Sequence, residues 1–443
     1  MNTDEAQQVD VIIIGGGLAG LATACYLARG GAGVRLYEKS KELGGRAETT
    51  DYDGFKLNRG IHALYTGGAL DKVLRELKIP YSGHSPQAVF VLRAGKLHEF
   101  PAGAGSLLKT GLLGLGDKIE LARLFMRLPG LQAERFARVS VQDWIFQETN
   151  RPRVREFLLA FACTNVYSSA LELVSAEVLI KKLQIALGHP VLYIDGGWQT
   201  LVEGLRQATV QAGAEIITNR RVEAVEYVQG RVQGVRLADG ERVRARAVVI
   251  ATTPQEALKL VGAGSYAPLH AIIEDLIPAR VACLDVALRC LPDPTHPIVQ
   301  HATKPLFMTA QSLYARVAPG DGAVIHAFKQ LDLVHPGDSK EDERDLEELL
   351  DAVQPGWRKL VVKRIFLPHI AALGMLPTAA GGGYAGRPGP QVPGIDNLLL
   401  VGDWIGPGFL ADASVGSARQ VARLLLRDGR PGGEAEEIDV VYS

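Results

Sequence analysis

The sequence predicts an α/β protein in which a parallel-sheet domain, assembled from separate stretches of the chain, is interrupted by an inserted α+β domain of mixed antiparallel sheet and helices. Two observations lead to this prediction. A strand, a glycine-rich turn, a helix and a second strand follow one another between Val9 and Glu38. Apolar patterns typical of buried strands then return far along the chain, at Val248 to Ala251 and at Asn397 to Val401.

Length and composition set the outer limits. The chain has 443 residues, more than one hydrophobic core usually supports, so two domains are expected. Its 48 basic and 49 acidic residues give a net charge of -1, which provides no positive field for nucleic acid. The N-terminus lacks the pattern of a secretory signal, and no apolar run approaches the roughly 18 residues of a membrane-spanning helix. These features predict a cytoplasmic protein.

The cysteines support the same location. They lie in apolar runs without the Cys-x-x-Cys spacing of a redox or zinc site, and we interpret all of them as reduced core residues. They are Cys25, Cys163, Cys283 and Cys290.

The first forty residues carry the clearest motif. Gly15 allows a tight turn after the first strand, Gly17 lets backbone N–H groups approach a pyrophosphate, and Gly20 lets the helix pack closely on the strand. Glu38 ends the second strand, where a carboxylate accepts hydrogen bonds from a ribose hydroxyl and disfavours a 2′-phosphate. The spacing predicts a dinucleotide site.

The middle of the chain changes character. Gln87 to Phe100 predicts two strands around a turn, and Asp117 to Leu128 has the apolar spacing of a helix. More helix is expected through Val141 to Leu179, and Val222 to Val243 alternates like a small antiparallel meander. Later strands are expected at 281–288, 323–328 and 361–367.

These elements predict the domain boundaries. The Gly/Pro-rich segment Gly381 to Gly394 is the clearest linker, and a helix is expected at Ala413 to Leu426. The parallel-sheet domain is predicted to comprise residues 1–80, 190–255 and 385–430. The inserted domain, which would hold the substrate, is predicted at 81–189 and 256–384, and residues 431–443 are expected to be an acidic tail.

Three further segments have the chemistry of a dinucleotide site. Gly44-Gly45-Arg46 follows the second strand, where backbone and guanidinium can meet a phosphate pair. Gly402-Asp403 closes a buried strand, where a carboxylate can hold a ribityl or ribose hydroxyl. The segment Ala411 to Ala418 resembles a helix start that could face a flavin carbonyl, although Asp412 and Ser414 fit equally well as simple helix caps.

With these segments in order, the chain resembles the superfamily of FAD-dependent amine oxidases and phytoene desaturases. The match also includes Asn58 to His62 and Asp195-Gly196-Gly197, and the segment Gly60-Ile61-His62 is closer to the phytoene-desaturase branch. The resemblance implies a Rossmann-like domain that binds extended FAD. The residues that it places on FAD are Gly15, Gly17, Leu18, Ala19, Gly20, Glu38, Lys39, Gly44, Gly45, Arg46, Gly60, Ile61, His62, Val222, Ala251, Thr252, Gly402, Asp403, Ser414 and Val415.

The resemblance implies an FAD-dependent oxidoreductase that takes a hydride from a carbon of a largely apolar molecule and forms a C=C or C=N bond. A flavin amine oxidase, a flavin-assisted isomerase without net redox change and a non-catalytic binding protein remain alternatives. His62 is the candidate catalytic residue, because an imidazole beside a flavin can orient a substrate or move a proton. The ten histidines show no spacing for a metal site.

The expected partner is an apolar small molecule. Phe100 to Leu128 is rich in leucine with lysines nearby, so it fits either helices that cover an internal cavity or a peripheral contact with a membrane. The acceptor that reoxidises the flavin is left open among oxygen, a quinone and a protein, and a homo-oligomer is left open as well.

Overall fold

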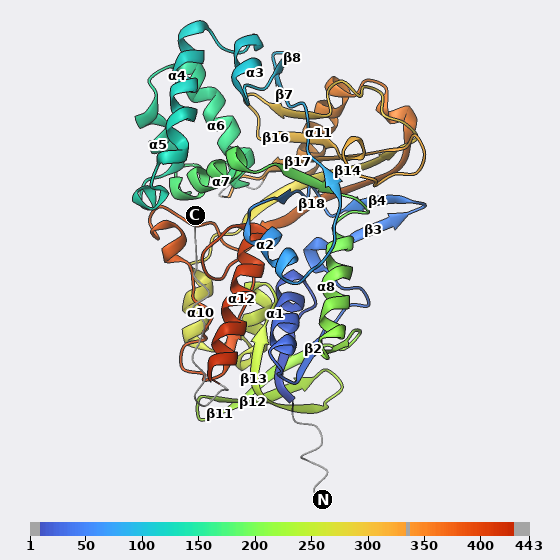
Figure 1. Ribbon diagram of the computed structural model, residues 1–443, viewed down its shortest axis with the longest axis vertical. Helices are drawn as coiled ribbons and strands as arrows, with labels where there is room; N and C mark the ends of the chain where they lie inside the picture. Colours follow the sequence, from blue (N-terminus) through green and yellow to red (C-terminus); the bar gives the residue numbers. More distant parts are fainter. Residues whose placement is uncertain (1–8, 334–336, 429–443) are drawn as a thin grey trace, which may run out of the picture.

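The computed structural model describes residues 9–333 and 337–428, so the predicted tail at 431–443 lies outside the described residues. Two sheets, each covered by helices, occupy opposite ends of the molecule (Figure 1). The arrangement is the α/β architecture that the sequence predicts.

The first sheet has seven strands, and its parallel centre is built from distant parts of the chain. Strand β1 pairs with β2 on one side and with β13 on the other, and β19 extends the parallel pairing beyond β13. The strands are β1 (Val9–Ile14), β2 (Val34–Tyr37), β10 (Glu215–Ile217), β11 (Val222–Val228), β12 (Arg231–Leu237), β13 (Arg242–Ile250) and β19 (Leu398–Leu400).

The predicted meander and the predicted strand at Val248 share one continuous strand. The first half of β13 pairs antiparallel with β12, and its second half pairs parallel with β1. The burial pattern changes along β13. Exposed and buried residues alternate in its first half, and four consecutive residues, Ala247 to Ile250, are buried at its end. The change marks the point where the strand enters the part of the sheet that is covered on both faces.

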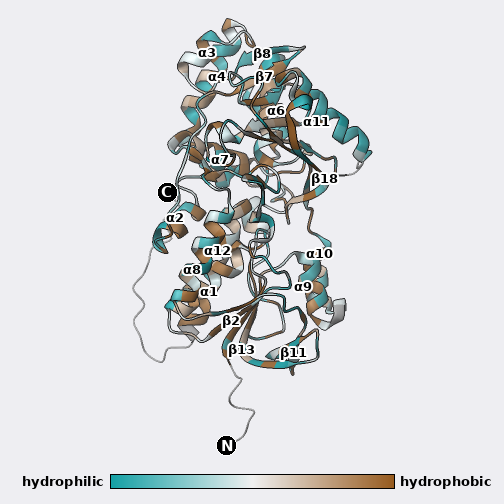
Figure 2. Ribbon diagram, turned by 90° about the vertical axis from the view of Figure 1, so that its right-hand side faces the viewer, coloured by the Kyte–Doolittle hydropathy of each residue, from teal (hydrophilic) through white to brown (hydrophobic). Residues whose placement is uncertain are grey.

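Helices cover both faces of this centre (Figure 2). Alternate strand residues such as Ile13 and Val249 pack against α1, α8 and α12, whereas Ile12 and Ile250 pack against α9 and α10. The helices are α1 (Leu18–Arg29), α8 (Gln199–Gln211), α12 (Leu410–Asp428), α9 (Pro254–Leu260) and α10 (Ala267–Glu274). Because α9 and α10 pack on the first sheet, the boundary predicted at residue 255 falls before the helices that belong to this core.

The second sheet is mixed, and its order is β18-β14-β17-β16-β15-β7-β8. All its neighbours are antiparallel except β15 and β7, which bring the two pieces of the inserted region together. Helix α11 (Ser339–Val353) covers one face and turns a hydrophilic side outward (Figure 2). The strands are β7 (Phe90–Arg93), β8 (Lys96–Glu99), β14 (Ala279–Leu288), β15 (Ile298–His301), β16 (Leu306–Ala310), β17 (Ala323–Gln330) and β18 (Val361–Leu373).

The remaining helices and short strands complete the fold, with α3 to α6 beside the second sheet (Figure 1). The other helices are α2 (Ala69–Glu76), α3 (Ala104–Lys109), α4 (Leu115–Arg127), α5 (Val141–Glu148), α6 (Pro152–Val166) and α7 (Ala176–Gly188). The short strands are β3 (Thr49–Tyr52) with β4 (Phe55–Asn58), and β5 (Leu64–Tyr65) and β6 (Gly83–His84) on either side of β9 (Val191–Ile194).

All four cysteines are free thiols, but their burial differs from the prediction. Cys25 and Cys283 are buried, Cys163 is partly buried, and Cys290 is exposed. The prediction of a core position for Cys290 is wrong because this residue follows the end of β14, where the chain leaves the sheet.

Gly20 tests the close packing of α1 on β1. A Cβ at Gly20 would lie 1.9 Å from the carbonyl oxygen of Gly15, which is backbone and cannot move aside. We expect Gly20→Ala to lower the free energy of unfolding of the flavin-free protein by about 3 kcal/mol in urea denaturation. The control is Gly105→Ala in α3, where a Cβ meets nothing within 4 Å and should stabilise by about 1 kcal/mol or less. Equal stability of the two variants would contradict the packing argument.

Candidate cofactor and substrate site

The N-terminus of α1 opens toward the glycine turn without a side chain over it. Gly17 occupies the cap position and no side chain caps the helix, so the first amides of Leu18 and Ala19 are available to an anion. Beside them, one oxygen of the Glu38 carboxylate accepts the N–H of Gly16 at 2.7 Å, and the other accepts the N–H of Ser40 at 2.9 Å. The carboxylate is therefore held at the end of β2, where a ribose would lie.

A second glycine segment lies against the first. The N–H of Gly44 donates to the carbonyl of Gly16 at 2.9 Å, and Gly17 and Gly44 form a parallel bridge. Gly44 and Gly45 have φ values of 119° and 57°, which favour glycine. A Cβ on Gly17 would have the Gly44 carbonyl as its nearest neighbour, at 3.8 Å. The two segments therefore present a cradle of bare backbone, as a pyrophosphate requires.

Arg46 and Asp403 close this cradle from opposite ends of the chain. The two guanidinium nitrogens of Arg46 lie 2.6 and 2.5 Å from the two carboxylate oxygens of Asp403, and Gly374 N–H donates to the same carboxylate at 2.7 Å. Burial by itself raises the pKa of Asp403, but Arg46 and the Gly374 amide outweigh burial and lower it. Arg46 keeps 45% of its side chain exposed, so the guanidinium can still reach a phosphate.

The remaining predicted contacts surround the ends of β1, β2 and β13. A Cβ on Gly15 would meet the carbonyl oxygen of Ala251 at 2.5 Å, and the Thr252 carbonyl accepts the indole N–H of Trp404 at 3.0 Å. Val222 begins β11, two residues after Arg220, whose N–H donates to the Glu38 carbonyl. Lys39 is exposed and lies 3.6 Å from Glu256. The backbone groups around these strand ends fit a dinucleotide.

Helix α12 begins earlier than the sequence predicts. It starts at Leu410, and the N–H groups of Asp412 and Ala413 already donate to the Phe409 carbonyl. Ser414 and Val415 therefore lie beyond the free amides of the first turn, which are the groups that can face a flavin. Asp412 does cap a helix, but a different one, because its carboxylate accepts the N–H of Leu70 in α2 at 2.7 Å.

His62 lies in the segment that joins the two sheets. Its Nδ1 lies 3.1 Å from the Gly60 carbonyl oxygen, and its ring packs edge-on against Trp198 at 4.8 Å. Because a carbonyl only accepts, Nδ1 is the donor in this contact, and the backbone of Arg46 also interacts with the ring. Burial lowers the pKa of His62, so the ring is neutral at pH 7.

The sequence reasoning missed a buried pair behind this segment. Asp285 on β14 accepts the N–H of Gly60 at 3.2 Å and lies 2.6 Å from Nδ1 of His326 on β17. Both side chains are buried, and Nε2 of His326 has no hydrogen-bond partner among the described residues. A hydrogen-bonded series thus runs from His326 through Asp285 and the Gly60 peptide to His62. The sequence did contain a signal for this pair, because Asp285 and His326 are polar residues within otherwise apolar strand patterns.

A cluster of buried and partly buried apolar side chains, which we name the apolar wall, lies next to Gly60. A Cβ on Gly60 would come within 2.9 Å of the Cys283 sulfur, which places the segment directly on β14. The wall consists of buried Val281, Cys283 and Phe328 and of partly buried Ile61, Tyr167, Phe307, Leu367, Ile370 and Ala372.

Asp195-Gly196-Gly197 has a structural task. Asp195 accepts the backbone N–H of Arg316 at 2.7 Å and pairs with its guanidinium at 3.0 Å. A Cβ on Gly197 would lie 2.5 Å from the Thr49 side chain. The motif therefore ties the turn before α8 to its neighbours.

A substitution at Gly17 can test cofactor binding without affecting folding. Its φ of -78° suits alanine and a methyl group has room, so the flavin-free Gly17→Ala protein should melt at the wild-type temperature. The methyl would stand between the α1 amides and a pyrophosphate, so we expect the purified variant to lose most of its flavin absorbance, with Gly105→Ala as the unaffected control. Full flavin content in Gly17→Ala would refute the position of the cradle.

Comparison with known proteins gives distant relatives. The chain is 25% identical over 260 residues to carotenoid 3,4-desaturase of Haloarcula japonica, covering 49% of this chain and 50% of the relative. It is 26% identical over 306 residues to a limonene dehydrogenase component of Castellaniella defragrans, covering 56% and 53%. The chain thus matches about half the length of each. An oxidoreductase of Methanosarcina mazei shares the fold, with a TM-score of 0.74, 19% identity and coverage of 94% and 100%.

A family model identifies the relationship. The model described as flavin-containing amine oxidoreductase matches residues 18–273, which is more than half of the chain. The matched range starts at the helix that opens on the cradle and includes Glu38, Arg46 and His62. FAD is therefore the cofactor for which the cradle is arranged, and the chain belongs to the family of flavin-containing amine oxidoreductases.

Proposed function

We propose that this FAD-dependent oxidoreductase desaturates a largely apolar small molecule. The observation that carries the proposal is the apolar wall beside Gly60-Ile61-His62, the segment expected at the flavin. An apolar wall binds a substrate by excluding water and offers few polar contacts. Two relatives carry names that fit such a substrate, a carotenoid desaturase and a limonene dehydrogenase.

The chemistry requires one group besides the cofactor. Desaturation removes a hydride from one carbon and a proton from its neighbour, and the electron pair left by the proton forms the C=C bond. Bound FAD supplies the hydride acceptor. We propose that Nε2 of His62 takes the proton, while the Gly60 carbonyl fixes the ring and Asp285 fixes Gly60. We therefore assign His62 as the proton acceptor.

Amine oxidation is less well supported by this arrangement. An amine substrate is a cation at neutral pH and is usually held by aromatic faces. The aromatic cluster that could do this, Tyr65, Tyr167 and Phe409, already surrounds the ammonium of Lys182. A second cation in the same place would be repelled.

The role of His62 can be tested by flavin reduction. Anaerobic stopped-flow mixing with an isoprenoid lipid extract should bleach the flavin of the wild type, and a panel of amines should not. We expect His62→Gln to retain flavin but to slow bleaching about 100-fold. The wild-type rate should fall only below about pH 6.5, because the lowered pKa keeps His62 unprotonated above it.

The control for this test is His270→Gln, which changes an exposed histidine on α10. An unchanged rate in His62→Gln would remove His62 from the chemistry. Bleaching by amines alone would favour an oxidase, and substrate conversion without bleaching would favour an isomerase. Reoxidation of bleached protein by oxygen, by a quinone or only by a protein fraction would then identify the electron acceptor.

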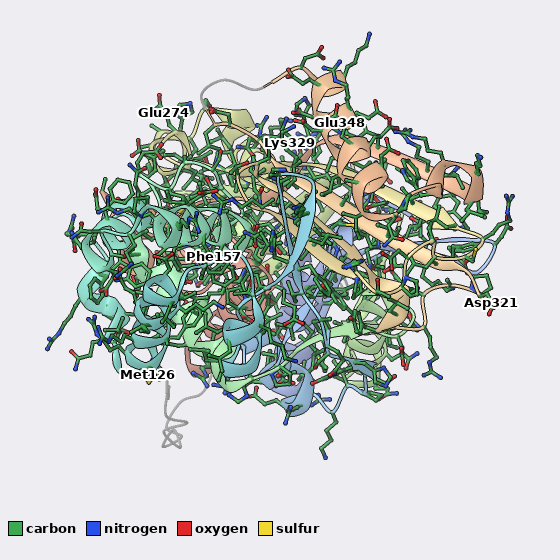
Figure 3. All side chains as sticks on the ribbon, turned by 90° about the horizontal axis from the view of Figure 1, so that it is seen from above. Met126, Phe157, Glu274, Asp321, Lys329 and Glu348 are labelled. Atoms are coloured by element: carbon green, nitrogen blue, oxygen red, sulfur yellow. The ribbon has the colours of Figure 1, made fainter. Side chains whose placement is uncertain are left out.

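We also propose a cytoplasmic protein that contacts a membrane peripherally through α3 and α4. None of the helices in the described ranges combines the length and apolar character needed to cross a membrane. Leu107 and Leu112 of this stretch are buried, but Leu108, Leu115 and Met126 are 73–75% exposed. Figure 3 shows Met126 at the periphery of the molecule, pointing outward. Exposed Lys109 and Arg123 add positive charge that suits anionic lipid.

Vesicle flotation tests the membrane contact. With vesicles rich in anionic lipid, the wild type should float, and the double variant Leu115→Glu/Met126→Glu should remain mostly in the soluble fraction because two acids replace the apolar contacts. Val228→Glu, at an exposed position on β11 in the other part of the molecule, is the control and should float like the wild type. Flotation of the double variant would refute α3–α4 as the contact.

A further inference from the structure

A buried lysine stands at the end of the apolar wall. Lys182, on α7, is only 7% exposed, and its ammonium lies 4.8 Å from the ring of Tyr65, 4.8 Å from Tyr167 and 5.2 Å from Phe409. The rings come from β5, from the C-terminal end of α6 and from the residue before α12. Three elements distant in sequence therefore surround one charge.

Tyr167 connects this lysine to the substrate surface. Its ring stacks on Phe328 of the apolar wall at 5.6 Å, and it also lies beside the ammonium of Lys182 and the ring of Phe409. Tyr167 has a φ of 55°, a left-handed conformation that a non-glycine residue rarely adopts. Such conformations gather at binding and catalytic sites, where the surrounding structure compensates the strain. Tyr167 thus brings the apolar wall and the ammonium into contact with the same ring.

The ammonium is incompletely satisfied. It has three N–H donors, and its hydrogen bond to the Asn165 carbonyl, at 2.6 Å, is the one it makes with the described residues. Asp412 is the nearest opposite charge that acts on it, but the two form no ion pair in the described structure. Asp412 is engaged by the amides of α2. Donors are therefore left for a ligand.

Burial makes this an unfavourable place for a charge. Desolvation lowers the pKa of Lys182 to about 7 and raises the pKa of Asp412 to about 6. A methionine of similar length would fill the same space without a desolvation cost. An ionisable group kept in such a position is typical of a functional site.

We propose that Lys182 anchors an oxygen atom, a hydroxyl or a carbonyl, at one end of an otherwise apolar substrate. The inference rests on the proposed function, because it gives the substrate of the His62 site a polar end. A neutral oxygen accepts an N–H from Lys182 and adds no charge. An amine, by contrast, would face the ammonium itself.

Binding of matched prenyl compounds tests the anchor. Farnesol and the hydrocarbon farnesene share one apolar body and differ at the end. Calorimetric titration of the flavin-loaded wild type, kept reduced under anaerobic conditions so that the flavin accepts no hydride, should give about tenfold tighter binding of farnesol than of farnesene. Because no turnover occurs, a failure of this test is distinct from a failure of desaturation.

Substitution of Lys182 tests whether its ammonium causes the preference for farnesol over farnesene. In Lys182→Met the ratio between farnesol and farnesene should fall close to one while farnesene binds as before. The control is Lys72→Met, the same change at an exposed position on α2, which should keep the wild-type ratio. Failure of farnesol to bind better than farnesene in the wild type overturns the proposal, and so does an unchanged ratio in Lys182→Met.

A pH series shows whether the ammonium serves folding instead. The lowered pKa means that the unfolded chain binds one more proton at Lys182 between about pH 7 and pH 10.5. Wild-type stability relative to Lys182→Met should therefore rise with pH across this window, as measured by urea denaturation of the flavin-free proteins. The opposite slope would show an ammonium stabilised by the fold and would overturn the anchor.

Discussion

The parallel pairing of β1, β13 and β19 is the interaction on which the rest of the structure depends. Ile14 lies opposite Ile250, and Ile250 lies opposite Leu400, so three strands separated by more than a hundred residues end at one edge. Backbone hydrogen bonds fix the register of the three strands. A shift of one residue would turn buried side chains toward the wrong face of the sheet. The chain leaves the edge at Gly15, at Ala251 and at Val401, which is why the glycine cradle, Thr252 and Asp403 meet.

The second sheet positions the segment that carries Gly60 and His62, because side chains along β14 point alternately to its two faces. In β14, Leu284 and Val286 face α11, whereas Cys283 and Asp285 face the segment that carries Gly60. A carboxylate at such a position is costly unless it is hydrogen-bonded. The Gly60 amide and His326 provide those bonds, so the group that satisfies Asp285 also fixes the segment of His62. The hydrogen bond between Gly60 and Asp285 therefore both stabilises the buried carboxylate and helps to orient His62, the proposed base.

The two buried ionisable groups of the site, Asp403 and Lys182, differ in how far neighbouring groups compensate their charge. Asp403 is fully compensated, with two nitrogens of Arg46 and one amide on its carboxylate, and the pair joins the beginning of the chain to its end. Lys182 has aromatic faces and one carbonyl. A compensated pair stabilises a fixed geometry, whereas an undercompensated ammonium beside an apolar wall keeps free energy available for a ligand. This contrast distinguishes the cofactor end of the site from the substrate end.

The sequence by itself determined the βαβ unit with Gly15, Gly17, Gly20 and Glu38, because each of these roles depends on neighbours within thirty residues and on backbone conformation. It also placed most strands of both sheets through their apolar patterns. Only the tertiary structure decided that α12 begins at Leu410, that Asp285 meets His326 and Gly60, and that Lys182 lies among three aromatic rings. Such contacts join residues up to several hundred positions apart, and their geometry follows from strand order and helix packing, which local periodicity does not encode.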